Sequence, residues 1–180
     1  FPVFTKDILL ANEDVANAFI ATFTIGIGLG SMITNLLLKG EVSAKYVPVA
    51  AIMMTVFLID LYFAAGQVNA NLAGTTLNGV SVFFSGWASW RVAFDLFLTA
   101  FFGGIYAVPL NAIMQTRASP PKRSRVIAAN NLINAIFMIS ATVTSVILLQ
   151  FISARGLFLC LGLANAVAAI WICFLLPQET

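Results

Sequence analysis

Residues 155–176 read RGLFLCLGLANAVAAIWICFLL, and this stretch decides the fold class because it is almost wholly apolar after its first residue. A helix needs about 20 such residues to cross a bilayer. Four more stretches of this kind precede it, with approximate bounds 14–38, 45–65, 92–115 and 126–150. The sequence therefore predicts an all-α, polytopic transmembrane helix bundle of five spans, forming one domain over residues 1–180.

Composition excludes several classes of protein. Hydrophobic residues make up 61% of the chain and charged residues 9%, whereas a soluble domain carries roughly 25% charge. The net charge of +2 is too small to indicate a nucleic-acid partner. No histidine is present, and Cys160 and Cys173 lie too far apart on one predicted helix to pair. We therefore expect no metal, no cofactor and no enzyme active site within these residues.

The basic residues predict how the spans cross the membrane, because Lys and Arg concentrate on the cytoplasmic side. Six of the nine lie in the gap after the first span or the gap after the third, and these two gaps fall on the same face. The N-terminal end is thus expected outside and the C-terminal end in the cytoplasm. The remaining gap of any length, 66–90, is expected to be an outer interfacial loop. Its aromatic residues suit the headgroup zone and are Phe83, Phe84, Trp87 and Trp90.

Three charged residues lie within or at the edge of the predicted spans. Asp60 is expected about 8 Å from the centre of its span, where a carboxylate is costly unless it is paired or faces water. Structural pairing, with Arg91 or with a group outside this chain, and a role in transport remain alternatives for it. Arg91 and Asp95 are spaced four residues apart at the outer start of the third span. They form either an ion pair that gates an outer vestibule or a simple anchor of the helix start.

Small residues within the spans predict close helix packing. Gly26 and Gly30 form a GxxxG pair, which lets two helices approach closely; a contact at which helices rock is the functional alternative. Gly103, Gly104 and Pro109 interrupt the third span, and proline removes one backbone hydrogen bond. Such loosened helices are typical of transport pathways when polar side chains lie near them.

Amide side chains follow this interruption and continue on the next span. Asn130 and Asn134 are four residues apart and share a helix face. Interhelical hydrogen bonding and the lining of a cavity for a polar headgroup are the two interpretations. The candidate cavity residues are Tyr106, Asn111, Gln115, Asn130 and Asn134.

Several short motifs in the second half of the chain form one recognisable set. They are Arg91-x-x-x-Asp95-Leu96, Gly103-Gly104-x-Tyr106-x-Val108-Pro109-Leu110, Gln115-x-Arg117 and Arg123-x-Arg125-Val126-Ile127-Ala128-Ala129-Asn130-Asn131. This set resembles the lysophospholipid transporter family of the major facilitator superfamily, above all members fused upstream of an acyltransferase and an acyl–acyl-carrier-protein synthetase. The first gap, Lys39-Gly40-Glu41-Val42-Ser43-Ala44-Lys45, departs from the superfamily's basic loop because it lacks the usual Asp and the run of Arg.

The resemblance implies that the five spans correspond to helices eight to twelve of a twelve-helix transporter of the bacterial inner membrane. The expected substrate is a lysophospholipid, carried by alternating access. The expected partners are membrane lipid, an N-terminal half of the same transporter that these residues do not include, and a fused or associated acyltransferase. Two alternatives remain: a facilitator that carries another small molecule, and a non-transporting membrane anchor for an acyltransferase.

Overall fold

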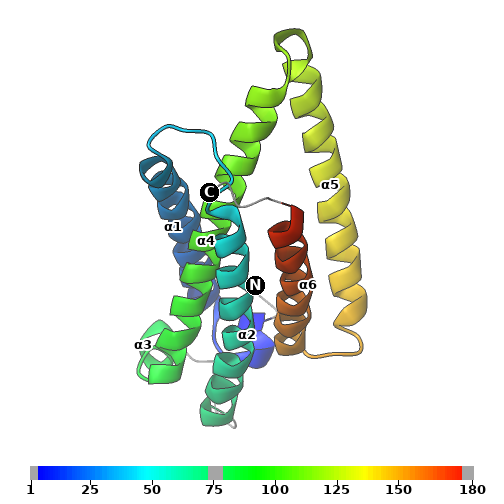
Figure 1. Ribbon diagram of the computed structural model, residues 1–180. Helices are drawn as coiled ribbons and strands as arrows, with labels where there is room; N and C mark the ends of the chain where they lie inside the picture. The colour runs from blue at the N-terminus through cyan, green and yellow to red at the C-terminus, as the bar shows by residue number, and fades with distance from the viewer. Residues whose placement is uncertain (1–3, 73–78, 176–180) are drawn as a thin grey trace.

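The computed structural model describes residues 4–72 and 79–175, which form an all-α polytopic bundle (Figure 1). Five of its helices are long and apolar enough to cross a membrane, so the chain is a multi-pass membrane protein, and the predicted fold class is confirmed. The elements are η1 (Phe4–Ile8), α1 (Glu13–Leu38), α2 (Val47–Leu72), α3 (Val80–Phe83), α4 (Trp87–Arg117), η2 (Pro120–Lys122), α5 (Arg123–Leu148) and α6 (Ala154–Leu175).

Local chemistry sets both ends of α1. The Asn12 side chain accepts a hydrogen bond from the Val15 backbone N–H at 3.3 Å, which satisfies one of the free donors of the first turn. Glu13 and Asp14 follow, and their charges complement the positive end of the helix dipole. The helix stops where Lys39 and then Gly40 adopt positive φ angles of 49° and 84°, the left-handed conformation common after a helix end.

The second helix is longer than predicted. The expected span 45–65 ended before Gly66, yet α2 continues to Leu72. Asn69 holds this last part in place by donating a hydrogen bond from Nδ2 to the Ile8 carbonyl oxygen at 2.8 Å. The expected outer interfacial loop 66–90 is therefore only partly a loop, because its first residues belong to α2 and its last four begin α4.

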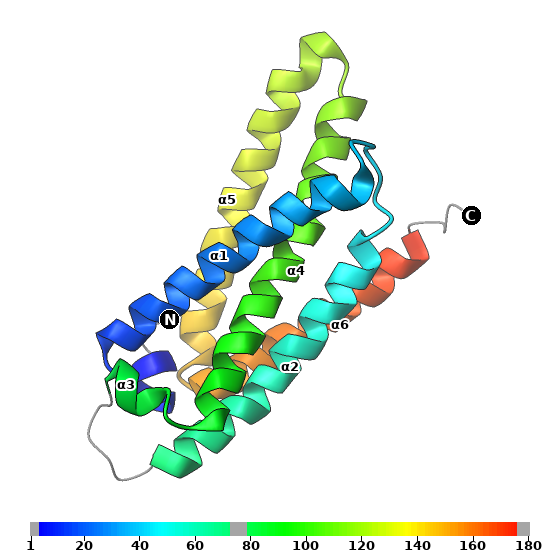
Figure 2. The same ribbon diagram turned by 90° about the vertical axis from the view of Figure 1, so that its left-hand side faces the viewer.

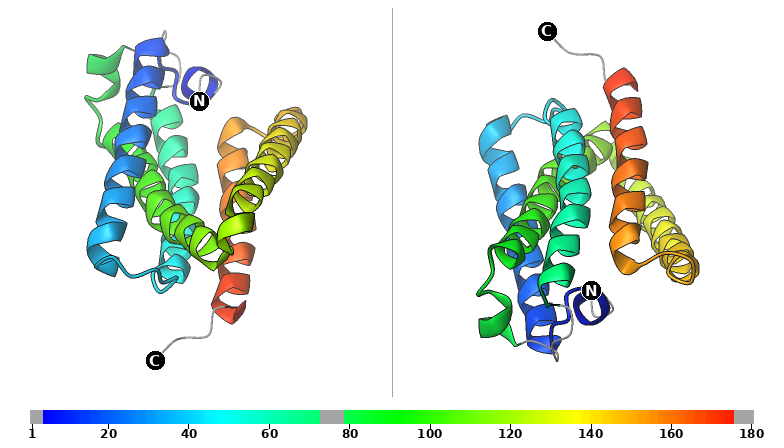
Figure 3. Two further views of the ribbon diagram at one scale, coloured as in Figure 1. Left: turned by 90° about the horizontal axis from the view of Figure 1, so that it is seen from above. Right: turned by 90° about the horizontal axis from the view of Figure 1, so that it is seen from below.

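Helix α4 is the centre of the bundle. Both α1 and α2 pack along it, and α6 packs on the other side of α2 (Figures 2 and 3). Helix α5 runs back from the hairpin around η2 and diverges from α4 (Figure 1). The connections after α1 and after α4 lie toward the same end of the bundle, as the positions of their basic residues predicted.

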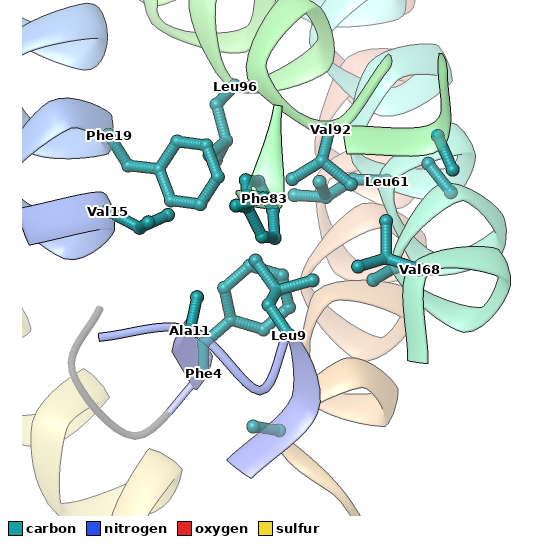
Figure 4. Packing of buried hydrophobic residues seen from close by; sticks show 14 residues of the cluster. Phe4, Leu9, Ala11, Val15, Phe19, Leu61, Val68, Phe83, Val92 and Leu96 are labelled. Carbon is teal, nitrogen blue, oxygen red and sulfur yellow. The ribbon is translucent and has the colours of Figure 1, made fainter. Parts of the chain in front are cut away.

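A hydrophobic core lies at the opposite end, where η1, α1, α2, α3 and α4 meet (Figure 4). The Phe19 and Phe83 rings meet edge to face there, with centroids 5.7 Å apart. Phe83, which was expected on the outer leaflet surface, is instead 1% exposed. The short helix α3 turns it inward, while Trp87 remains 81% exposed as expected for an interfacial residue.

Helix α5 differs from the others because none of its residues, all of which the structure describes, is buried. Large apolar side chains, among them Phe137, Met138 and Ile139, are exposed on it. A lipid bilayer or neighbouring helices must cover this surface, since water would not tolerate an apolar area of this size.

Candidate functional site

The strongest polar contact within the spans joins α2 to α4. Arg91 Nε donates to Asp60 Oδ2 at 2.9 Å, and Nη2 donates to Oδ1 of the same carboxylate. The third nitrogen of the guanidinium, Nη1, lies 3.5 Å from Gln67 Oε1. A bidentate contact between an arginine and a carboxylate is among the strongest hydrogen-bond arrangements in proteins. It therefore ties the middle of α2 to the start of α4.

Asp60 lies nearer the middle of its helix than the sequence suggested. It is thirteen residues from the start of α2 and twelve from its end, so it is close to the middle of the helix rather than about 8 Å beyond it. The difference arises because α2 extends to Leu72. A carboxylate at this depth needs a partner, and Arg91 supplies it.

Asp95 lies beside this pair, and its environment differs from the expected one. It is 2% exposed and about 12 Å along α4 from Trp87, so the surrounding helices cover its side chain. Arg91 pairs with Asp60 instead of forming an ion pair across one turn with Asp95. Asp60, Arg91 and Asp95 lie within electrostatic reach of one another. Its Oδ2 atom has no hydrogen-bond partner among the described residues.

The glycines of the GxxxG pair lie at the crossing of α1 and α4. A methyl group at Gly26 would lie 2.6 Å from the Phe97 carbonyl oxygen, and one at Gly30 would collide with the Phe101 carbonyl. From the other side, a methyl group at Gly104 would lie 2.7 Å from the Ile27 carbonyl oxygen. The backbones touch here because no side chain separates them. Gly103 lies outside this crossing, since its closest neighbour would be the Met54 side chain at 3.9 Å.

Pro109 does not break α4, which is helical from Trp87 to Arg117. The proline is buried and leaves the Ile105 carbonyl without its usual helix donor. Asn111 contributes nothing to a neighbouring helix, because its Nδ2 donates to the Ala107 carbonyl oxygen of its own helix at 2.9 Å.

The candidate cavity residues are not enclosed by the described part of the chain. Asn111, Gln115 and Asn134 are exposed, and Tyr106 and Asn130 are half-buried. They lie on two helices that diverge from a shared hairpin, and α5 has little contact with the rest of the bundle (Figure 1). The structure therefore places these residues on open surfaces of α4 and α5.

Polar contacts made by Asn165 and Arg155, neither of which the sequence predicted, hold α6 against α2. Asn165 Nδ2 donates to the Ala51 carbonyl oxygen at 2.8 Å and to Thr55 Oγ1 at 2.9 Å. At the start of α6, the Arg155 guanidinium lies over the Tyr62 ring of α2, 4.8 Å from its centroid. A lone amide in an otherwise apolar span was the available signal for Asn165.

Across residues 4–72 and 79–175, no three His, Cys, Asp or Glu side chains lie together in a way that could hold a metal ion. The charged cluster of Asp60, Arg91 and Asp95 is thus the main polar feature inside the bundle. No protein-family model, no curated protein and no solved structure matches this chain.

Proposed function

We propose that this chain is part of a membrane transporter that moves lysophospholipid across the bacterial inner membrane by alternating access. The observation that carries the proposal is the charged cluster of Asp60, Arg91 and Asp95, which joins the middle of α2 to the first turns of α4 and includes the buried carboxyl group of Asp95. Charged groups at such depth are costly and are typical of substrate or ion pathways. A chain that only anchored another domain would gain nothing from them.

The class of substrate rests on the sequence motifs and on the character of the α4–α5 hairpin. A lysophospholipid has a polar headgroup and a single acyl chain, so its carrier needs amide or charged groups beside apolar surface. The hairpin offers both: Asn130 and Asn134 lie on the same α5 face as Phe137, which is 69% exposed. In the proposed transporter this face lines the substrate cavity, together with Asn111, Gln115 and the N-terminal half.

Alternating access requires rigid helix groups that move against each other. Helices α1, α2, α4 and α6 are joined by the glycine crossing, by the pair of Asp60 and Arg91, and by Asn165. They would move together as one body. Helix α5 has little contact with them and would depend on the second half of the transporter for its packing.

The proposed orientation follows the basic residues, with the connections after α1 and after α4 in the cytoplasm. Lysophospholipid would then enter from the outer side and leave on the side where a fused or associated acyltransferase could reacylate it.

Uptake of labelled lysophospholipid into spheroplasts tests the proposal. The protein is produced in its intact form, and arrival and reacylation of the label are followed with and without it. Protein-dependent uptake is expected, and the double variant Asn130→Ala, Asn134→Ala should reduce it several-fold at unchanged abundance. Asn17→Ala is the matched control, because Asn17 is an exposed amide on α1, outside the α4–α5 hairpin.

The open position of these amides favours one alternative, a membrane anchor for an acyltransferase. If the protein is present in the membrane and uptake does not depend on it, the anchor interpretation replaces transport. If the protein takes up another small molecule but not labelled lysophospholipid, it is a facilitator of different specificity.

A further inference from the structure

Asp95 is a buried acid that takes no part in the neighbouring ion pair of Asp60 and Arg91. It is 2% exposed, and its Oδ2 atom has no partner among the described residues. One helical turn farther along α4, Thr99 is 7% exposed and its hydroxyl is also without a partner. Buried polar side-chain atoms without a hydrogen-bond partner are rare in proteins, and each one calls for a structural or functional explanation.

The charges that face Asp95 come from two helices. Asp60 on α2 and Arg91 on α4 act on it directly. On α1 the charged residues are Glu13 and Asp14, which are exposed in its first turn. On α6, the charged residue is Arg155, which lies over the Tyr62 ring. On η1, the charged side chain that the structure describes is Lys6, which is exposed. The short helix α3 has no charged residue. The cluster therefore contains two acids and one base.

The two acids and one Arg leave the cluster with one negative charge too many. With both acids ionised, the cluster would carry a net negative charge in a medium of low dielectric constant, and two carboxylates that share a site do not both ionise readily. Asp60 accepts from Arg91 through both of its oxygens, so Asp60 is the one stabilised as an anion. A metal cation is a poor candidate for balancing the charge, because Arg91 repels it and the Asp60 oxygens are already engaged.

We propose that Asp95 is a proton-binding site within the bundle. In the protonated state Asp95 carries the proton on one oxygen, the cluster is neutral, and Arg91 is held by Asp60. When the proton leaves to water, the Asp95 carboxylate forms and competes with Asp60 for Arg91, which lies one turn away on the same helix. Proton release would thereby weaken the tie between α2 and α4. Use of this step to drive transport rests on the proposed function, whereas the proton site itself does not.

Infrared spectroscopy of the purified intact protein in lipid nanodiscs tests the site without any substrate. A protonated carboxylic acid has a carbonyl-stretching band that a carboxylate lacks, and spectra are compared between acidic and alkaline buffers. Wild-type protein is expected to show this band from a site shielded from solvent, and Asp95→Asn should lose it. Asp14→Asn is the matched control and should keep it, since Asp14 is exposed at the start of α1.

A second variant tests the competition for Arg91. In Asp60→Asn, Arg91 loses its partner and Asp95 becomes the nearest carboxylate, so the band should also disappear at neutral pH although Asp95 is present. Asn has the shape of a neutral Asp, and retained folding is checked by size-exclusion chromatography. A band that persists in Asp95→Asn, or a wild-type spectrum without any Asp95-dependent band, overturns the proposal. Either result leaves lysophospholipid uptake in spheroplasts to be decided separately.

Discussion

Arg91 on α4 donates to both carboxylate oxygens of Asp60 on α2. Asp95 lies on the same helix as Arg91 and one turn away, yet its Oδ2 atom has no hydrogen-bond partner among the described residues. The choice of partner follows from geometry. Residues four apart on one helix are also neighbours, but Asp60 approaches the guanidinium from the neighbouring helix and accepts from it through both carboxylate oxygens. The contact thus joins two spans that are separate in sequence.

This contact predicts a measurable coupling between the two residues. Arg91→Gln leaves the Asp60 carboxylate without its charged partner and should destabilise the protein by about 2 kcal/mol, the usual range for a hydrogen bond to a charged group. Asp60→Asn should have a similar effect. The double variant should lose much less than the sum of the two. Thermal unfolding in detergent measures all three, and purely additive losses would contradict the pair.

The crossing of α1 and α4 predicts a sharp difference between two nearby glycines. Gly30→Ala places a methyl group against the Phe101 carbonyl, whereas a methyl group at Gly28 meets no atom within 4 Å. Because the methyl group would meet backbone atoms of Phe101, which cannot turn aside as a side chain can, the helices must separate, and overpacking of this kind costs about 1–3 kcal/mol. We expect a clear drop in melting temperature for Gly30→Ala and almost none for Gly28→Ala. Equal effects of the two substitutions would mean that α1 does not cross α4 at this point.

The fold class was predictable because it depends on a coarse property, the length of apolar stretches. The end of α2 was not, since Gly66 and the amides that follow it are typical of loops. What keeps those residues helical is tertiary: the hydrogen bond from Asn69 to the Ile8 carbonyl joins two segments that are far apart in sequence. Phe83 was misplaced for the same reason, because a short aromatic segment suits a membrane surface as well as a pocket between helices.

The residues of the charged cluster could be identified from sequence, but not their pairing. Asp60, Arg91 and Asp95 stand out because charges in apolar spans are rare. The spacing of Arg91 and Asp95 is visible in the sequence, whereas the register of α2 against α4 depends on side-chain packing along both helices. Asn165 carries no charge and so stands out less in its span, and its partners Ala51 and Thr55 follow only from the register of α6 against α2.

The contact of Asn165 predicts how α6 is held. Asn165→Ala removes two hydrogen bonds to α2, and interhelical hydrogen bonds in membranes contribute about 0.6–2 kcal/mol. The variant should therefore melt at a lower temperature, and Asn131→Ala, on the exposed face of α5, should not. The effect of Asn165→Ala should also shrink in a Thr55→Val background, because one of its two acceptors is then already absent. If Asn165→Ala lowers the melting temperature as much in the Thr55→Val background as in the wild type, Asn165 does not act through its hydrogen bond to Thr55.

The proposed orientation predicts which connections can be labelled from each side of the membrane. Single cysteines at Glu41 and Ser119, both exposed in the basic connections, should react with an impermeant thiol reagent only after the cells are opened. Cysteines at Ser85 and Gln150, exposed at the opposite end, should react in intact cells. The background lacks Cys160 and Cys173, which are exposed on α6 and lie within a span. If Glu41→Cys and Ser119→Cys are both labelled from outside, the orientation is the reverse of the proposed one, and Lys and Arg mark the outer face.

If only one of the two is labelled from outside, the result contradicts the arrangement of the spans, since the structure places both connections at the same end of the bundle (Figure 1).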